Sequence, residues 1–332
     1  MRNLAIVLLL AVASHLPASA QVFLQNTMYR YTRFVYNPAA AGGAQAGMEP
    51  GINLTLLGRQ QWLGIEGAPR SSVAFVNGTL PENFGSIGAT IATEQLGNWS
   101  ASWLEVAYAF QFALGDNLRL NIGASGGFRQ ALLSGDGWVY NILREGVDPV
   151  VPTVTQSVIV PSLAAGVYLT SVDADGREGN FFVGLSGQNL LEPSIEGALG
   201  ESGIGEDQTI PRSFTLMGGY RFDFNERSSL QPMVMLQADN LFPPQANLSL
   251  YWNYRPLVVG ANYRFFNESV GALVGFNISD RAFFAYSYDF VLNSLNRNGD
   301  IGSHELVLSY TFPSSKGVPG RKVDILDESN TQ

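Results

Sequence analysis

The 332-residue sequence contains no cysteine, and charged residues make up only 14% of it. The missing cysteine excludes disulfides, thiolate metal sites and a lipidated cysteine anchor. Ordinary soluble domains carry about 25% charged residues, so this composition is unusual for a protein surrounded by water. The charges that are present sum to −9, which argues against nucleic acid as a partner.

Long apolar runs are also missing from most of the chain. After residue 20 no stretch approaches the roughly 18 consecutive apolar residues of a membrane-spanning helix. Glycine, in contrast, is abundant at 36 of 332 residues, against a usual share of about 7%, and aromatic residues reach 11%. Few charges, many glycines and aromatics, and no apolar helix together favour an all-β fold, a transmembrane antiparallel β-barrel.

The first 20 residues have the pattern of a secretory signal peptide. Arg2 is a short basic start, LAIVLLLAVA (4–13) is an apolar run, and PASA (17–20) supplies small residues at the cleavage positions. We predict cleavage after Ala20 and an exported protein. The alternative is an N-terminal anchor helix, but the apolar run is shorter than the roughly 20 residues that span a bilayer.

Alternation of apolar and polar residues indicates the strands. In SHELVLSYTF (303–312) every second residue from His304 is apolar or aromatic, and the residues between them are more polar. The same pattern recurs in 117–126, 212–224 and 284–290. The polar sides carry Ser, Thr, Asn, Gly and Gln rather than Lys and Glu. This favours a surface that faces a lumen over the solvent face of a soluble sandwich or lipocalin-like barrel.

We predict about fourteen strands, an even number as in bacterial single-chain barrels. They lie near 51–60, 70–80, 85–94, 100–114, 117–132, 156–171, 179–190, 209–224, 229–239, 246–254, 257–265, 269–278, 281–291 and 303–312. The chain then divides into a signal peptide (1–20), an N-terminal plug or rim segment without alternation (21–50), an outer-membrane barrel (51–312) and a flexible periplasmic tail (313–332).

The connections between these strands alternate in length. GD (115–116) and SD (279–280) are short, whereas 133–155 and 292–302 are long. Outer-membrane barrels have short periplasmic turns and long outer loops, so this asymmetry supports the strand count. Two aromatic girdles are expected at the ends of the strands. We assign Tyr310 and Phe312 to the inner girdle, and to the outer girdle Trp62, Trp99, Trp103 and Trp138.

A buried charge pair is expected where the barrel closes. Arg59 and Glu305 both have lumen-facing parity, near the outer ends of the first and last strands. Because these strands become neighbours on closure, we predict that Arg59 and Glu305 approach each other across the seam, with Asp289 nearby. The alternative is that each pairs with other lumen groups.

The sequence offers little support for catalysis or for a metal. His304 is the one histidine outside the signal peptide, and a lipid-hydrolysing barrel would need it as a general base. It shares the lipid-facing parity, so we interpret it as an interfacial or structural residue. DADG (173–176) resembles the start of a calcium loop but lacks the downstream Glu. We therefore predict no catalytic residue, no metal and no cofactor.

Three segments together resemble the PorP/SprF family. They are YNPAAAGG (36–43), RQQWLGIEGAPRS (59–71) and GSHELVLSY (302–310), and their order and spacing also match. The resemblance implies a fourteen-stranded outer-membrane barrel of the type IX secretion system of Bacteroidetes. It also implies a role in secreting or anchoring a large adhesin-like protein with a C-terminal sorting domain, or in binding other components of the secretion machinery.

The resemblance also implies where a partner would bind. We expect residues 34–43 and the outer loop 59–71 to shape the site. The candidate residues are Tyr36, Asn37, Pro38, Gln61, Trp62, Gly67 and Pro69. The alternative is that these residues only shape turns and the girdle. A passive pore or small-molecule transporter remains the alternative function.

Overall fold

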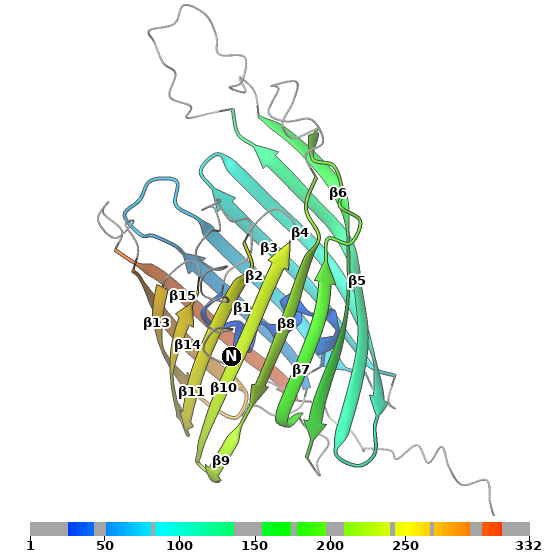
Figure 1. Cartoon of the computed structure of the whole chain (residues 1–332), viewed down its shortest axis with the longest axis vertical. Helices are drawn as coiled ribbons and strands as arrows, with labels where there is room; N and C mark the ends of the chain where they lie inside the picture. Colours follow the sequence, from blue (N-terminus) through cyan, green and yellow to red (C-terminus); the bar gives the residue numbers. More distant parts are fainter. Residues whose placement is uncertain are drawn as a thin grey trace, which may run out of the picture.

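A computed structural model describes residues 26–42, 51–80, 84–135, 155–173, 178–196, 209–239, 243–265, 269–292 and 301–313. The described residues form an antiparallel sheet that closes into a barrel, which confirms the predicted fold class (Figure 1). Among them, no helix has the length and apolarity needed to cross a membrane. The predicted signal peptide and almost all of the predicted tail lie outside the described residues.

The strands follow one another around the barrel in chain order. Their bounds are β1 (Gly51–Gln60), β2 (Arg70–Thr79), β3 (Ser86–Leu96), β4 (Trp99–Ala113), β5 (Leu118–Leu133), β6 (Gln156–Val172), β7 (Glu178–Gln188), β8 (Ser213–Tyr220), β9 (Phe222–Asn225), β10 (Ser228–Asp239), β11 (Gln245–Tyr254), β12 (Leu257–Arg264), β13 (Ser269–Asn277), β14 (Ala282–Val291) and β15 (Ser303–Pro313). Three short helical turns precede them, η1 (Tyr29–Tyr31), α2 (Arg33–Tyr36) and η2 (Pro38–Ala40).

These elements make fourteen barrel strands, because β8 and β9 are two parts of one strand. Both pair with β10, and the break between them falls at Arg221. Its backbone N–H donates to the carbonyl oxygen of Asn180, 2.7 Å away, and its guanidinium bonds the side chains of Asn180 and Asp223. The predicted strand at 209–224 is therefore interrupted near its end, and regular pairing in it begins only at Ser213.

The barrel closes through the pairing of β15 with β1, in a register that runs from Gly51 opposite Pro313 to Gln60 opposite His304. We call the end of the barrel at Gly51 and Pro313 the turn end, because short connections such as 226–227 and 255–256 lie there. The opposite end, at the top of Figure 1, is the loop end. It carries the connections 134–155, 189–212 and 292–302.

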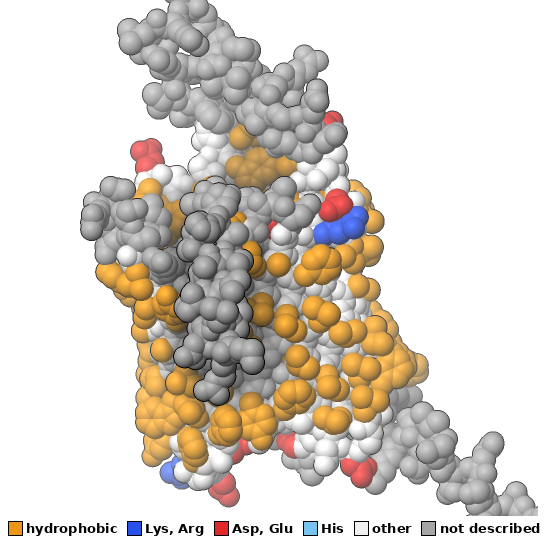
Figure 2. Space-filling model, in the orientation of Figure 1, with side chains coloured by type: hydrophobic (Ala, Val, Ile, Leu, Met, Phe, Trp, Pro, Cys, Tyr) orange, Lys and Arg blue, Asp and Glu red, His pale blue; other side chains and the backbone are white. Residues whose placement is uncertain are grey.

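The outward face of the wall is apolar, as the alternation predicted. On β15, Leu306, Leu308, Tyr310 and Phe312 are exposed, whereas Glu305 and the other residues of opposite parity are buried inside. Figure 2 shows hydrophobic side chains over the wall and charged side chains near its two ends. A belt of this kind on a closed barrel suits the hydrocarbon core of a bilayer, since every strand backbone is paired.

Aromatic pairs gather on the outward face at the turn end, as expected of a girdle. They are Phe110–Phe112, Tyr220–Phe222, Trp252–Tyr254 and Tyr310–Phe312. The prediction for Trp103 was wrong, because this residue points into the lumen and is 7% exposed. Its neighbours Leu104 and Val106 take the outward positions of β4, so Trp103 has the inward parity. Trp138 lies outside the described residues.

Candidate functional site

Residues 26–42, which we call the plug segment, lie inside the barrel (Figure 1). All of its residues except Val35 and Gly42 are buried. Its fold is set locally by Asn37 and Pro38. The Asn37 side-chain oxygen accepts a hydrogen bond from the Ala39 N–H at 2.9 Å, and Pro38 occupies the first position of η2. Both are residues that favour the start of a helical turn.

The wall has small residues where the plug segment approaches it closely. A Cβ atom at Gly123 would lie 2.6 Å from the Ala39 nitrogen, and one at Gly184 would lie 2.9 Å from the Asn37 amide nitrogen. The backbone of η2 therefore packs directly against β5. Asn37 donates to the carbonyl oxygen of Val167 at 3.0 Å, which ties the plug segment to β6.

Asn37→Ala should lower the stability of the docked plug segment by about 1–3 kcal/mol, because it leaves buried backbone groups without partners. Asn37→Asp should cost at least as much, since its carboxylate would face the Val167 carbonyl oxygen that the amide now bonds. Protease accessibility of the plug segment and the thermal unfolding midpoint would measure the effect. Unchanged values for both variants would show that the anchor is dispensable.

A charge cluster holds the other end of the plug segment, towards the loop end of the barrel. Arg59 donates to Glu305 at 2.8 Å and to Asp289 at 2.6 Å, and all three side chains are at most 1% exposed. The sequence predicted this approach across the seam. Charges removed this completely from water persist only when they are paired and hydrogen-bonded.

The plug segment completes this cluster. The backbone N–H groups of Thr27 and Met28 donate to the two carboxylate oxygens of Glu305, each at 2.9 Å. The Thr27 hydroxyl donates to Asp289 at 2.5 Å and accepts from Arg59 at 3.0 Å. The cluster therefore binds two backbone N–H groups and one hydroxyl of the plug segment, and it loses these hydrogen bonds if the segment leaves.

Arg264 is a further member that the sequence analysis did not identify. Its guanidinium lies 3.8 Å from Asp289 and donates to the Thr27 hydroxyl at 3.2 Å. It is oriented by Asn247, whose side-chain oxygen accepts from its Nε at 3.0 Å. Alternation along β12 was enough to predict that Arg264 faces the lumen. It could not predict that Arg264 reaches the cluster at the seam between β1 and β15.

A second ion pair holds the middle of the plug segment at the opposite wall. Arg33 of α2 donates to Glu178 and to the Tyr168 hydroxyl, each at 2.5 Å. Its guanidinium also lies over the Phe182 ring, 4.6 Å from the centroid. Since Arg33 and Glu178 are 145 residues apart in the chain, no local pattern indicated this contact.

Tyrosines and a phenylalanine fill the remaining contact surface of the plug segment. Tyr31 stacks on Phe283 with ring centroids 4.5 Å apart, and Phe34 packs against Phe75 at 5.7 Å. Burial raises the pKa of the Tyr31 hydroxyl, and it raises that of Tyr36, to which the nearby Glu305 charge adds. Both phenols therefore stay neutral at physiological pH.

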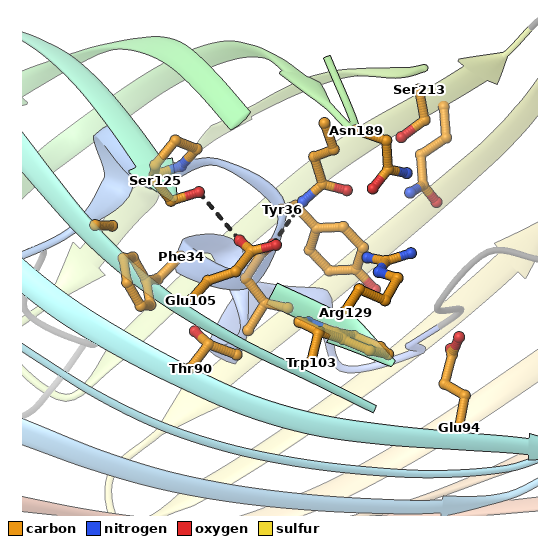
Figure 3. A pocket seen from close by; sticks show the side chains of 15 residues that line it. Phe34, Tyr36, Thr90, Glu94, Trp103, Glu105, Ser125, Arg129, Asn189 and Ser213 are labelled. Atoms are coloured by element: carbon orange, nitrogen blue, oxygen red, sulfur yellow. Dashed lines mark hydrogen bonds between the residues drawn. The ribbon is translucent and has the colours of Figure 1, made fainter. Parts of the chain in front are cut away.

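Tyr36, Asn37 and Pro38, proposed from the sequence as partner contacts, are all buried in this conformation. Asn37 is enclosed, whereas Tyr36 and Pro38 form part of the lining of a luminal cavity on the loop-end side of the plug segment. The cavity has a volume of about 50 Å³ (Figure 3). Its walls come from β3, β4, β5, β7, β8 and β10.

The other partner candidates lie in the loop between β1 and β2. Gln61 and Pro69 close its base through a backbone hydrogen bond of 2.8 Å. Gly67 is exposed, with a φ of 73° that favours glycine, and its carbonyl accepts from the Gly97 N–H at 2.8 Å. The Trp62 backbone N–H donates to the Ser303 hydroxyl at 3.2 Å. The loop is thus an ordered ledge at the loop end.

His304 lies on the outward face between two tyrosines. Its Nδ1 is 2.7 Å from the Tyr286 hydroxyl, and its ring is edge-on to Tyr288 at 5.2 Å. The described part of the chain holds no group of three or more His, Asp or Glu residues placed to hold a metal ion. Most of the DADG turn lies outside the described residues.

Known barrels resemble the chain at low sequence identity. A search of curated proteins finds no significant match. The Ralstonia pickettii toluene transporter TbuX is 12% identical with a TM-score of 0.47, and covers 89% of this chain and 95% of its own. The Acinetobacter baumannii outer membrane protein Omp33 is 9% identical with a TM-score of 0.44, covering 80% and 100%. Likenesses this distant say nothing about function.

The model of one protein family matches nearly the whole chain. This family is described as type IX secretion system membrane protein PorP/SprF, and the match covers residues 18–310. Together with the closed barrel and its apolar belt, the match places the protein in the outer membrane. The chain therefore belongs to the PorP/SprF family of type IX secretion system membrane proteins.

Proposed function

We propose that this barrel is a non-enzymatic secretion component that binds a large secreted or surface protein carrying a C-terminal sorting domain, and helps to secrete it or to anchor it. The loop end would face the outside of the cell and present the binding surface. Other secretion-machinery components are further candidate partners. The family supports the setting in type IX secretion.

The observation that carries this proposal is the plug segment in the lumen. A segment held by Arg59, Asp289 and Glu305 at one wall, and by Arg33 and Glu178 at the other, would obstruct the passage of solutes. A barrel in this state is suited to holding a partner rather than to conducting. The ordered ledge at 61–69 gives the loop end a defined surface that a protein could recognise.

A pull-down in mild detergent from the native outer membrane, followed by mass spectrometry, tests the proposal. We expect a large surface protein or a machinery component to co-purify in stoichiometric amount. A barrel that comes out alone, under conditions that preserve other membrane complexes, would contradict it. Ion conductance of the reconstituted barrel would then favour the alternative, a passive pore or small-molecule transporter.

The same assay tests the ledge. Trp62→Ala should lower the amount of captured partner at least about tenfold, since a buried aromatic contact at an interface is worth about 2 kcal/mol or more. The matched control is Trp252→Ala, which removes an exposed tryptophan from the outward face at the turn end. If the two variants capture equal amounts, Trp62 does not contact the partner.

A further inference from the structure

The luminal cavity carries polar groups that neither the plug segment nor the wall uses. The plug segment forms its floor through Phe34, Tyr36 and Pro38. Asn189 and Ser213, which also line it, adjoin the loop-end termini of β7 and β8. The cavity therefore extends from the plug segment towards the loop end, where a partner would dock.

Arg129 is the first of these groups. Its guanidinium lies over the Trp103 ring, 4.7 Å from the centroid, and Figure 3 shows the two side chains stacked beside Tyr36. Its Nε is buried without a hydrogen-bond partner among the described residues. Arg129 forms no direct ion pair, unlike Arg33, Arg59 and Arg264, although the charges of Glu105 and Glu94 act on it across the cavity. A guanidinium held in one orientation by stacking presents its donors to the cavity.

The two acidic residues of the cavity differ in their environment. Glu105 is hydrogen-bonded at both carboxylate oxygens, which accept from the Ser125 hydroxyl at 3.0 Å and the Ser162 hydroxyl at 2.5 Å. Glu94 lies across the cavity from Glu105 in Figure 3, and the opposite charge that acts on it is that of Arg129, beyond the distance of a direct ion pair. Among the described residues, Glu94 accepts no direct hydrogen bond, although the Arg129 charge acts on it across the cavity.

Gln237 is the third unused group. Its side chain is 3% exposed and lines the cavity, and its Oε1 has no hydrogen-bond partner. Buried polar atoms in proteins are nearly always paired, so such an atom at a cavity wall indicates a ligand or an ordered water. The cavity thus offers one cationic donor, at Arg129, and two free acceptors, at Glu94 and Gln237.

We propose that this cavity binds a segment of polypeptide that carries a carboxylate, with Arg129 as the partner of that carboxylate. The side-chain oxygens of Glu94 and Gln237 accept hydrogen bonds from N–H or basic groups of the same segment. This proposal rests on the proposed function, because it assigns the place where part of the partner protein enters the barrel. The proposed function names only a protein partner, whereas the cavity proposal names the chemical group of that partner that is bound.

Simpler ligands fit the cavity less well. An inorganic anion would satisfy Arg129 but would leave the acceptors Glu94 and Gln237 without donors. A hydrocarbon would leave all three groups desolvated, at a cost of about 1–3 kcal/mol for each neutral group and more for a charged one. A peptide carries acceptors and donors along one chain and can satisfy both kinds at once.

The absence of native cysteine allows a direct test. Ser213→Cys puts a unique thiol in the cavity wall, and Ser279→Cys puts one at the turn end outside it. Each variant is loaded with a thiol-linked photo-crosslinker after purification with its bound partner. We expect Ser213→Cys, and not Ser279→Cys, to cross-link a partner peptide that contains Asp, Glu or a chain-terminal carboxylate.

Arg129 variants then test its role in the Ser213→Cys background. Arg129→Gln should lower the cross-linking yield at least about tenfold, because a charged hydrogen bond contributes about 1.5–3 kcal/mol and 1.4 kcal/mol is a factor of ten. Arg129→Lys, which keeps the charge but loses the planar fork, should fall between Arg129→Gln and the unchanged residue. An unchanged thermal unfolding midpoint shows that a variant still folds.

The outcomes separate this inference from the proposed function. A partner that co-purifies but does not cross-link at Ser213→Cys, or cross-links equally well with Arg129→Gln, would overturn the cavity as its binding site. A cross-linked lipid or glycan would overturn the choice of a peptide. If no partner co-purifies, both the proposed function and this inference are contradicted.

Discussion

Glu305→Ala is expected to release the plug segment and turn a closed barrel into a conducting one. The substitution removes the acceptor of two backbone N–H groups of the plug segment and leaves Arg59 with only Asp289 as an ionic partner. Breaking a buried ion pair costs about 3–5 kcal/mol. A cost of that size shifts the docking equilibrium by a factor of roughly 100 to 4,000.

Planar-bilayer recordings of the purified barrel measure this effect directly. Wild type should show little conductance, whereas Glu305→Ala should show long openings. The matched control is Asp223→Ala, which breaks the Arg221–Asp223 pair, a much more exposed interaction at the break between β8 and β9. Pairs of that kind contribute at most about 1 kcal/mol, so the control should behave as wild type. A Glu305→Ala barrel that stays closed would show that the cluster does not secure the plug segment.

Gly123→Val should expel η2 without touching any charged group. A Cβ at this position would lie 2.6 Å from the Ala39 nitrogen and 2.7 Å from the Ala39 Cα, so the two backbones could not keep their present separation. Overpacking of this kind costs about 1–3 kcal/mol, and a branched side chain on β5 offers no rotamer that avoids the plug segment. We expect protease cleavage within the plug segment and increased conductance.

Gly126→Val on the same strand is the control for this substitution. Gly126 faces outward, and the nearest atom that its Cβ would meet is 3.9 Å away. A valine there adds apolar surface to the lipid-facing belt and should leave the plug segment docked. Equal conductance of the Gly123→Val and Gly126→Val barrels would mean that close contact at η2 does not keep the lumen closed.

The two substitutions act at opposite walls of the lumen, so their combination is informative. Glu305 lies on β15 beside the seam, whereas Gly123 lies on β5. If the plug segment leaves as one unit, either change alone should open the barrel, and the double variant should add little to the conductance. If the two ends move separately, each single variant should give a partial opening and the double variant a larger one.

Much of the barrel was predictable because its signal is local. In a strand, successive side chains point to opposite faces, so the parity of Leu306 and Glu305 decides which meets the membrane and which the lumen. The same rule gave the strand count and the position of the seam. It also contained the correct orientation of Trp103, whose neighbours Leu104 and Val106 are both apolar, but its position near a strand end was read as a girdle signal.

The seam pair shows how far such reasoning reaches. Parity put Arg59 and Glu305 in the lumen, and closure of an antiparallel barrel made their strands neighbours. These two facts suffice to bring them within reach, and the register places them directly opposite each other. Asp289 was placed nearby by the same argument. Parity could not predict that Thr27 and Met28 of the plug segment also bind this cluster, through their backbone N–H groups.

The sequence by itself determined the strands, the face each side chain takes and the closing pair, because all of these depend on a two-residue period and on strand order. Only the tertiary structure decided where residues 26–42 lie and what they touch. The Thr27–Glu305 contact joins residues 278 positions apart, and the Arg33–Glu178 contact joins residues 145 apart. Such contacts depend on the diameter of the closed barrel and on the height of each strand in it, and no local pattern encodes these quantities.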